Sequence, residues 1–568
     1  MKRALQPHAQ KILAALFIAI FVVTAALSVR HQSSTWDDPF HIIAGVSLWQ
    51  TGDTRLQADH PPLARLLGSV PALFMDAPPV AQASATAWES ADFVAIAAHY
   101  LPNVEDRLLW PGRLCMLSLS ILLGWLLYRW CSELHGENCV WFALALYAFC
   151  PVLLANAALV TTDMAATTFC FASLYTWWRY VKSPAPGTLA WVSVSVAAAF
   201  ASKHSALLLI PLLTMLGLIS IVSEAMSGSL RRRCRVIGTG LLAIAATTLI
   251  GLNLIYLFDG SMLTPPEYVQ RAMLHPGTSG LVQNGASRLA SFWPAWLPVP
   301  LPFYYVCGVL ELLGRVNSNG HATYFLGQTG LGGWPNYFPV LLLVKLSIPM
   351  LLLIAAGASQ AISRLSKEWW NLLFIASPVV LLVYAGSAGK MQIGFRHVLA
   401  VVPFLLMLAT YAIRWCRTRT GWLAAAALLI WNEGSSLAIH PDYLMYFNFI
   451  GGGADQGWRI SVTGDDYGQG DAALARWLQA RNVKALAYGG FGWGNAILNR
   501  AGIATKTLPC RDTGELTAAH IGSFLVAYTP EGTQCYDWMR LREPDLKIGY
   551  NIFVYNARAA SATEAVAP

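Results

Sequence analysis

Long apolar runs alternate with short polar segments through the first 440 residues of the chain. A helix needs roughly 20 consecutive apolar residues to cross the hydrocarbon core of a membrane, so this pattern predicts a series of spanning helices. The eleven predicted spans are 12–29, 111–129, 138–156, 162–180, 188–202, 204–222, 236–257, 337–357, 370–386, 397–413 and 421–439.

Basic residues fix the predicted orientation. With eleven spans, every basic cluster between spans falls on the same side, and cytoplasmic loops carry the excess of Lys and Arg. The N-terminus is therefore predicted to be cytoplasmic, and the length of the first apolar run favours a retained helix over a cleaved signal peptide. The clusters are Lys2, Arg3 and Lys11; Arg129; Arg179 and Lys182; Arg231 to Arg235; Arg364 and Lys367; and Arg414, Arg417 and Arg419.

The large polar segments then lie on the extracytoplasmic side, at 30–110, at 258–336 and after 440. The last segment, 441–568, is predicted to form a small α/β domain with a frayed tail. Its Cys510 and Cys535 stand apart from the apolar spans, as a disulfide or as two free thiols. The pattern predicts a helix at 471–480 and strands at 484–488, 523–527 and 548–555.

Composition agrees with a membrane protein. Hydrophobic residues make up 56% of the 568 residues and charged residues only 12%, and the mean hydropathy is +0.48. Soluble domains are about one quarter charged. The net charge of +8 does not indicate a nucleic-acid partner, because the basic residues form short clusters beside the spans.

The polar segment that follows the first span is the richest in candidate chemistry. Asp37 and Asp38 come directly after the span, and an amphipathic helix is predicted to follow, with Ile42, Ile43, Val46 and Leu48 on the membrane interface. Asp59 and His60 then precede Pro61-Pro62, a pair that stops a helix and stiffens the backbone.

Ionisable residues recur on the same predicted face. They are Asp163 between the third and fourth spans, Lys203 and His204 between the fifth and sixth, and Arg396 and His397 between the ninth and tenth. Charged groups at membrane depth are costly and usually functional. Carboxylates gathered with cations favour an anionic, lipid-linked substrate beside a general base, although Arg396 could equally pair with Asp residues or backbone.

These motifs resemble the GT-C glycosyltransferases, and within them the branch of the protein O-mannosyltransferases and the lipid A aminoarabinose transferase. The resemblance runs over nearly the whole chain and implies the GT-C fold, an all-α polytopic membrane protein with about eleven transmembrane helices. Its blocks are WDDPFH with DHPPL, TTDMAATTF, ASKHSALLLIPLL, YFLGQTGLGGWPNYFPVLLLVKLSIP, IGFRHVLAVVPFL and HPDYLMYFNFIGGGADQGWRISVTGDDYGQG.

The resemblance implies a reaction and a location. The donor would be a sugar on a polyprenyl phosphate held in the bilayer, attacked at the extracytoplasmic face by a hydroxyl of an acceptor protein, lipid or glycan. The location would be the inner (plasma) membrane of a bacterium, with residues 1–440 as the catalytic module. The sugar and the acceptor are left open.

Site roles follow by match to the family's motifs. Asp37 would be the general base and Asp38 the second candidate, while Asp163 would orient donor or acceptor. Asp59 matches the acidic residue before the family's Pro-Pro and is a further catalytic candidate. The predicted substrate-binding residues are His60, Lys203, His204, Arg396 and His41, with Lys203 matching the family's phosphate-binding Lys.

Two departures from the family stand out. Phe40 replaces a basic residue of the aminoarabinose branch, and VTGDDYGQGD replaces the DSNxDWGQD of bacterial relatives. Asp465 and Asp466 are therefore interpreted as acidic caps of a turn.

Metal dependence and mode of action stay open. Asp37, Asp38, His41, Asp59 and His60 could hold Mg²⁺ or Mn²⁺, but their spacing is no standard motif, so no cofactor is assigned. Trp36, Trp49, Trp293, Trp296 and Trp334 are predicted interface anchors, of which one or two could stack on a sugar. The alternative functions are a transporter or flippase of lipid-linked sugars and a non-catalytic scaffold. Transporters usually contain internal repeats, and no such repeat is found in this sequence.

Overall fold

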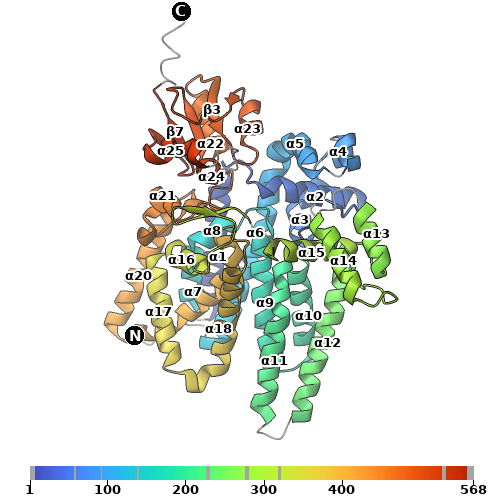
Figure 1. Ribbon diagram of the computed structural model, residues 1–568. Coiled ribbons are helices and arrows are strands. Elements are labelled where there is room, and N and C mark those ends of the chain that lie inside the picture. The colour runs from blue at the N-terminus through green and yellow to red at the C-terminus, as the bar shows by residue number, and fades with distance from the viewer. Residues whose placement is uncertain are drawn as a thin grey trace, which may run out of the picture.

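A helical module carries a small α/β domain at one end, as Figure 1 shows. This arrangement confirms the predicted fold class of a helical membrane module followed by a small C-terminal α/β domain. The computed structural model describes residues 7–56, 59–82, 84–90, 92–136, 140–225, 230–274, 280–317, 321–526 and 533–558, so most of the tail predicted to fray lies outside the described residues.

The helices of the module agree with the predicted spans, since each of the eleven falls on a helix or on two consecutive helices. Six helices of the described residues are long and apolar enough to cross a membrane, or seven if a pair bent by 110° is one span. The other predicted spans are interrupted, short or more polar. The six are His8–Val29, Phe93–His135, His204–Ser223, Leu230–Ile255, Leu365–Ala388 and Phe395–Cys416, and the bent pair is Tyr337–Lys345 with Ile348–Ile362.

The module's α-helices fall into those that form its bundle and those gathered near one end. The first group is α1 (Pro7–Val29), α6 (Leu109–His135), α7 (Val140–Ala148), α8 (Pro151–Asn156), α9 (Thr162–Lys182), α10 (Pro186–Phe200), α11 (Leu209–Ala225), α12 (Leu230–Ile255), α16 (Tyr337–Lys345), α17 (Ile348–Ile362), α18 (Leu365–Ala388), α19 (Val402–Thr410) and α20 (Arg419–Leu437). The second group is α2 (Asp37–Thr51), α3 (Leu63–Gly68), α4 (Ala85–Ser90), α5 (Phe93–Asn103), α13 (Pro265–Leu274), α14 (Gly280–Phe292) and α15 (Phe303–Asn317).

Short 3-10 and π-helical turns connect these helices. They are η1 (Val70–Leu73), η2 (Val80–Gln82), η3 (Val104–Leu108), η5 (His204–Leu208), η6 (Phe395–Val401), η7 (Tyr411–Arg417), η8 (Tyr443–Met445), η9 (Phe449–Gly451) and η10 (Gly457–Arg459).

Helix α2 is not the interfacial helix that its apolar pattern suggested. Ile42, Ile43 and Val46 have no exposed area and Leu48 is 7% exposed, because α2 packs against α3, α5 and α6 inside the protein. The same apolar residues can satisfy a membrane interface or a protein interior, and here they form part of the core that holds the N-terminus of α2 in place.

The C-terminal domain is built on a five-stranded mixed sheet of order β4-β3-β5-β7-β6. Strand β3 is parallel to β4 and to β5, and β7 is antiparallel to β5 and to β6. The strands are β3 (Ala485–Gly489), β4 (Ala504–Lys506), β5 (Thr517–His520), β6 (Leu546–Ile548) and β7 (Ile552–Tyr555), and the other elements are α21 (Gly453–Gln456), α22 (Asp471–Gln479), α23 (Gly494–Arg500), α24 (Ile521–Leu525), η11 (Thr533–Tyr536) and α25 (Asp537–Leu541). A separate two-stranded hairpin, β1 (Thr323–Phe325) with β2 (Gln328–Gly330), belongs to the module.

Three of the four elements predicted for this domain are confirmed. The helix at 471–480 is α22, the strand at 484–488 is β3, and 548–555 forms the end of β6 with β7. The strand predicted at 523–527 is wrong: the strand is β5, which begins six residues earlier at Thr517, and the apolar run becomes α24 with Phe524 and Leu525 buried. Cys510 and Cys535 form a disulfide.

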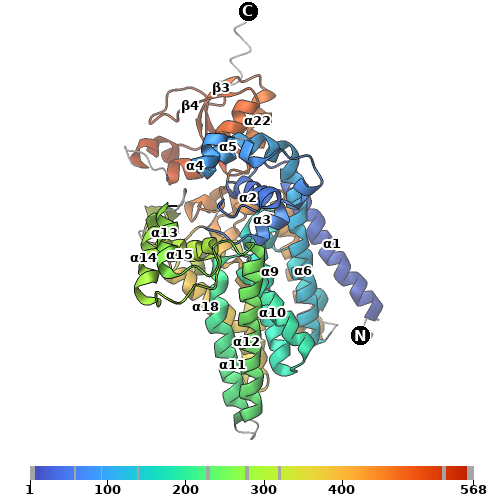
Figure 2. The same ribbon diagram turned by 90° about the vertical axis from the view of Figure 1, so that its right-hand side faces the viewer.

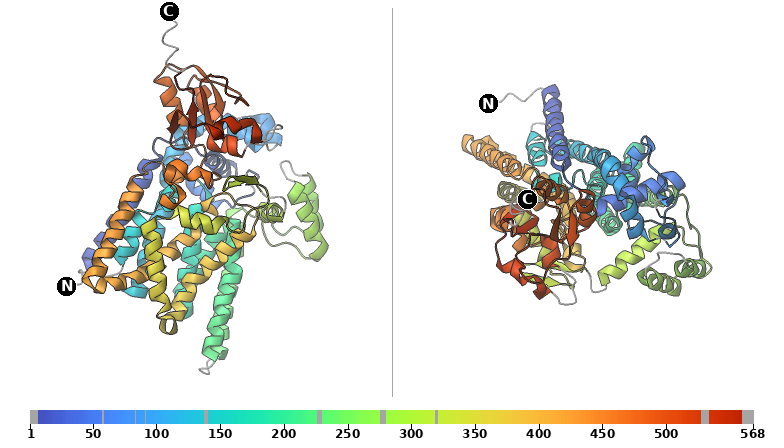
Figure 3. Two further views of the ribbon diagram at one scale, coloured as in Figure 1. Left: turned by 60° about the vertical axis from the view of Figure 1, so that its left-hand side comes forward. Right: turned by 90° about the horizontal axis from the view of Figure 1, so that it is seen from above.

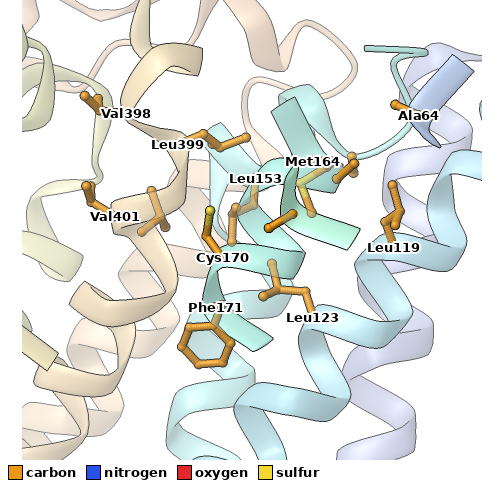
Figure 4. Close-up of a cluster of buried hydrophobic side chains, with 14 of the residues drawn as sticks. Ala64, Leu119, Leu123, Leu153, Met164, Cys170, Phe171, Val398, Leu399 and Val401 are labelled. Carbon is orange, nitrogen blue, oxygen red and sulfur yellow. The ribbon is translucent and has the colours of Figure 1, made fainter. Parts of the chain in front are cut away.

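A continuous apolar core lies beneath the end of the module that carries the domain. Figure 4 shows part of it, where Met164 and Phe171 of α9 pack near Val398 and Leu399 of η6 and Leu119 of α6. Met164 directly follows Asp163, and Val398 directly follows His397. Packing of these apolar side chains in the core therefore fixes where α9 and η6 begin.

The C-terminal domain shares its end of the molecule with the short helices of the module. In Figures 2 and 3, α2 to α5 and the pair α13–α14 lie on the same end as the sheet, while α11 and α12 extend toward the opposite end. Segments that are hundreds of residues apart in the sequence therefore meet at this end.

Candidate active site

A cavity of about 560 Å³ lies where the module meets the C-terminal domain. Its walls come from α2, the loop before α3, the N-terminus of α9, the turn before η5, α15 and η6, together with loops after residue 460. Six of the predicted site residues line it: Asp37, Asp59, His60, Asp163, Lys203 and Arg396.

Asp37 begins α2, where a negative side chain is favoured by the helix dipole. Arg396 donates from Nη1 to Oδ2 of Asp37 over 2.7 Å, and the hydroxyl of Tyr467 donates to the same oxygen. Arg396 also donates to the oxygen of Tyr467. No described residue donates to Oδ1 of Asp37, so that oxygen is available to a group in the cavity.

A chain of alternating charges extends from Asp37 along the cavity wall. Arg396 lies 3.8 Å from Oδ2 of Asp163, and Nζ of Lys203 donates to Oδ1 of Asp163 over 2.6 Å. Asp163 is in the first turn of α9, again at a helix N-terminus. Two carboxylates and two cations therefore alternate from α2 to the turn before η5.

Two glycines allow this arrangement. Gly394, directly before η6, has φ +76°, and a Cβ there would lie 2.6 Å from the carbonyl oxygen of Thr463. Gly464 has φ +81°, and a Cβ there would lie 2.8 Å from the carbonyl oxygen of Ile393. Only glycine fits such a backbone approach without strain, and the approach brings Arg396 and Tyr467 to one carboxylate.

The surroundings of Asp37 keep its carboxyl ionised. Burial alone would raise the pKa of Asp37, but the positive charge of Arg396, with smaller contributions from His41 and the Tyr467 hydroxyl, holds that pKa below its usual value. For the hydroxyl of Tyr467, burial and the nearby Asp37 charge raise the pKa well above its usual value. Asp37 is therefore an ionised carboxylate, and Tyr467 is a neutral hydrogen-bond donor to it.

Asp59 and His60 lie across the cavity at the start of the Pro-Pro segment. Nε2 of His60 is 3.9 Å from Oδ2 of Asp59, and the ring of His41 packs 5.3 Å from the ring of His60. His41 does not line the cavity itself. Burial, followed by the nearby His60, lowers the pKa of His41 to about 4, so His41 is neutral and cannot hold an anion by charge.

Asp38 points away from the cavity into a buried ion pair. Arg113 of α6 donates to its Oδ2 over 2.7 Å, Thr35 donates to the same oxygen through its backbone N–H and its hydroxyl, and Val160 N–H donates to Oδ1. All of these donors are structural elements around the N-terminus of α2. Asp38 thus anchors α2 and lies outside the cavity that its neighbour Asp37 lines.

His204 is also outside the cavity lining. It is 3% exposed, its ring packs 5.0 Å from the ring of Tyr305, and neither ring nitrogen has a hydrogen-bond partner among the described residues. The turn that presents Lys203 to the cavity therefore directs His204 into the protein.

Several lining residues were not predicted from the sequence, among them Tyr467 and the Arg315–Glu311 pair of α15, whose contact is 2.5 Å. Tyr467 lies inside the GDDYGQG block, whose departure from bacterial relatives drew attention to its acidic residues only. Arg315 and Glu311 are four residues apart on one helix, which in a sequence reads as a surface ion pair.

Asp465 and Asp466 do more than cap a turn. Asp465 pairs with the buried Lys345 of α16 at 2.8 Å, and burial, opposed by Lys345, raises the pKa of Asp465 to about 6. Asp466 accepts from Nδ1 of His520 at 2.6 Å, and Nε2 of His520 bonds Asp471 at 2.9 Å. The loop that carries Tyr467 is thereby held on both sides by ion pairs.

His520 is the centre of this clamp and provides a pH-dependent test. Burial would lower the pKa of His520, but Asp466 and Asp471 outweigh it and raise that pKa to about 10. The raised value means that the stabilisation is full below the unfolded pKa of about 6.5 and is lost as pH rises through about 10.

We expect His520→Gln to lower the free energy of unfolding by about 3–5 kcal/mol at neutral pH, because it leaves two buried carboxylates without a cation. The loss relative to the wild type should shrink between pH 6.5 and 10. Thermal unfolding of both proteins across this range measures it, and a difference that grows with pH would contradict the assignment.

The donor set does not form a metal centre. Among the residues that the structure describes, no group of three or more His, Cys, Asp or Glu side chains is arranged to hold a metal ion. Asp37 instead accepts hydrogen bonds from Arg396 and Tyr467, and Asp38 forms an ion pair with Arg113. The Mg²⁺ or Mn²⁺ left open by the sequence gains no support from this geometry, and no step below uses one.

Fold and site together define a multi-span membrane protein with a polar cavity at one end of its helices, where a free carboxylate oxygen lies beside cations. Residues 95–250 match the family model described as dolichyl-phosphate-mannose-protein mannosyltransferase. This segment contains Asp163 and Lys203, and the match confirms for it the resemblance to the protein O-mannosyltransferases. No curated protein matches the chain.

Three solved structures resemble the chain weakly. ArnT from Cupriavidus metallidurans bound to undecaprenyl phosphate shares 12% identity over 95% of this chain and 97% of that one, with a TM-score of 0.44. The apo form of the same ArnT shares 12% identity over 96% of this chain and 98% of that one, with a TM-score of 0.46. The apo oligosaccharyltransferase of Archaeoglobus fulgidus shares 12% identity over 87% of this chain and 64% of that one, with a TM-score of 0.41.

Proposed function

We propose that this protein is a membrane glycosyltransferase that moves a sugar from a polyprenyl-phosphate carrier to an acceptor hydroxyl, with Asp37 as the general base. One observation carries the proposal: a carboxylate with one free oxygen shares a cavity with Lys203 and Arg396, the cations that a departing phosphate needs. The match of residues 95–250 to a mannosyltransferase family supports the same class.

The reaction follows from these groups. The acceptor oxygen bonds to the anomeric carbon of the sugar, while the bond from that carbon to the phosphate oxygen breaks. Oδ1 of Asp37 takes the proton of the acceptor hydroxyl. The electron pair of the broken bond stays on the lipid phosphate, whose added charge is stabilised by the cations.

The cations are already paired in the free protein, and this shapes how the donor binds. Lys203 contacts Asp163, and Arg396 contacts Asp37. A phosphate that binds to Arg396 competes with Asp37 for it, which weakens the effect that lowers the pKa of Asp37. Donor binding therefore makes Asp37 a stronger base at the moment when the proton must be taken.

The full chain in nanodiscs, given a radiolabelled polyprenyl-phosphate sugar and a crude envelope extract as acceptor, tests the proposal. We expect free polyprenyl phosphate to accumulate together with labelled product. A nanodisc has no second compartment, so a transporter or flippase would leave the donor uncleaved. The transporter or flippase would be favoured if the donor stays intact through a prolonged incubation. It would also have to move the donor lipid across the membrane when the protein is placed in vesicles.

Lys203→Ala should raise the KM for the donor about 10–100-fold, because one charge-assisted hydrogen bond to phosphate contributes about 1.5–3 kcal/mol. Lys203→Arg, which keeps the charge, is the matched control and should retain most of the affinity. Donor kinetics in the nanodisc assay measure both variants, and an unchanged KM and kcat for Lys203→Ala would remove this residue from the phosphate site.

A further inference from the structure

The cavity has two chemically different halves. Every Lys and Arg among its described lining residues comes from the module: Lys203, Arg315 and Arg396. Among the lining residues of the C-terminal domain that the structure describes there is no Lys or Arg, and the acid Asp466 has both carboxylate oxygens occupied by His520, Asn551 and the N–H of Gly522. The domain half is therefore without net charge available to a ligand.

An aromatic wall made of Trp36 of the module and Phe491 of the domain borders the domain half. Trp36 lines the cavity and is 36% exposed, although the ring of Trp493 stacks on it at 5.5 Å and 17°. Phe491 lines the cavity beside it, with ring centroids 6.3 Å apart. The backbone N–H of Trp36 donates to the carbonyl of Tyr467 over 2.9 Å, and Nε1 of Trp493 donates to the carbonyl of Trp36 over 3.1 Å. This fixes the wall to the domain.

Between these aromatics the lining is made of small residues. Gly464, Gly492 and Gly522 bring backbone close to the cavity, and Thr463 and Ser523 add hydroxyl groups. Backbone without side chains allows a ligand to approach its peptide groups, and a flat aromatic face beside polar groups suits a ligand with apolar faces and hydroxyl edges.

We propose that the domain half of the cavity is the acceptor subsite and that it takes an uncharged saccharide stacked on Trp36. This rests on the proposed function and names its acceptor class. Trp36 and Asp37 both line this cavity. A sugar stacked on Trp36 therefore lies in the same cavity as the free oxygen of Asp37.

The two other acceptor classes fit this half less well. A phosphorylated lipid or an acidic glycan needs cations besides Lys203 and Arg396, which the proposed function assigns to the donor phosphate. The further Lys or Arg among the described lining residues is Arg315, which pairs with Glu311. An extended peptide is usually held by an unpaired strand edge. The edge strands of the sheet are β4 and β6, and none of their residues is among the described lining residues.

A glycan array that carries neutral glycans, acidic glycans and Ser/Thr peptides, probed with the full chain in nanodiscs, tests the inference. We expect binding to neutral glycans only. Trp36→Leu should weaken it at least tenfold, while Trp296→Leu, at an exposed Trp outside the cavity lining, should leave it unchanged. Val526→Lys, which adds a cation to the domain half, should create binding to acidic glycans.

Binding of radiolabelled undecaprenyl phosphate by the same samples separates this inference from the proposed function. Retained lipid binding also shows that Trp36→Leu is folded. Lipid binding without neutral-glycan binding, a preference for acidic glycans or peptides, or an equal loss in Trp296→Leu would each overturn the acceptor subsite. If the wild-type protein does not bind undecaprenyl phosphate, that result would count against the proposed function itself.

Discussion

Asp37→Asn is expected to lower kcat for sugar transfer at least a hundredfold while the donor lipid still binds. A positioned general base contributes about 10²- to 10⁴-fold to a rate, and the amide cannot accept the proton. The side-chain oxygen of Asn can still accept hydrogen bonds from Arg396 and Tyr467, which hold the carboxylate in the wild type. The variant should therefore keep its fold and its cavity.

The matched control for this variant is Asp53→Asn. Asp53 pairs with Arg55 at 2.8 Å and does not line the cavity, so its neutralisation should leave transfer unchanged. Transfer rates and undecaprenyl-phosphate binding are measured on both proteins. Near-normal transfer by Asp37→Asn would show that another group takes the proton.

Arg396→Gln is expected to lower kcat/KM by about a thousandfold and also to destabilise the protein. Arg396 is 14% exposed and lies 2.7 Å from Asp37 and 3.8 Å from Asp163. Its loss leaves two neighbouring carboxylates without their shared cation. It also removes a positive charge that would stabilise the departing phosphate. One preorganised donor to a developing anion contributes about 10²–10³ in rate, and an unpaired buried charge costs several kcal/mol.

This variant also has a pH signature. Arg396 is the largest influence that lowers the pKa of Asp37, so in Arg396→Gln the residual activity should fall off at a higher pH on the acid side than in the wild type. Arg396→Lys should recover part of the rate, because an ammonium group keeps the positive charge but lacks the planar, forked set of donors of the guanidinium group.

Arg500→Gln supplies the surface control. Arg500 pairs with Asp106 at 2.7 Å, with both side chains more than one third exposed, and such pairs contribute about 0–1 kcal/mol. Its activity and unfolding temperature should match the wild type. Equal behaviour of Arg396→Gln and Arg500→Gln would remove Arg396 from the site.

Much of the site could be predicted because its residues lie at boundaries between apolar and polar segments. Asp163, Lys203 and Arg396 interrupt or border spans, where a charge must have a partner, and the structure gives each of them one. The resemblance then selected the loop with Asp37 and Asp59. Periodicity alone could not separate Asp37 from Asp38, because two successive residues of a helix face different neighbours.

The rest depended on contacts between distant segments. Tyr467 is 430 residues from Asp37 in the sequence, and no local sequence pattern predicts a contact between residues so far apart. The burial of α2 was missed for a related reason: its apolar side chains could be covered by lipid or by protein, and only the tertiary structure decides. Strand β5 was missed because its Ala518 and Ala519 are small, while the more apolar run after it packs as a helix.

The clamp around Tyr467 has a consequence for biosynthesis. The Lys and Arg of the described lining, and the carboxylates Asp37, Asp59 and Asp163, lie in the first 440 residues, whereas Tyr467 and its supporting His520 are synthesised later. A nascent chain that has already inserted its helices therefore lacks the final partner of Asp37. The complete arrangement around Asp37 therefore forms only after the C-terminal segment has been synthesised and has packed on the module.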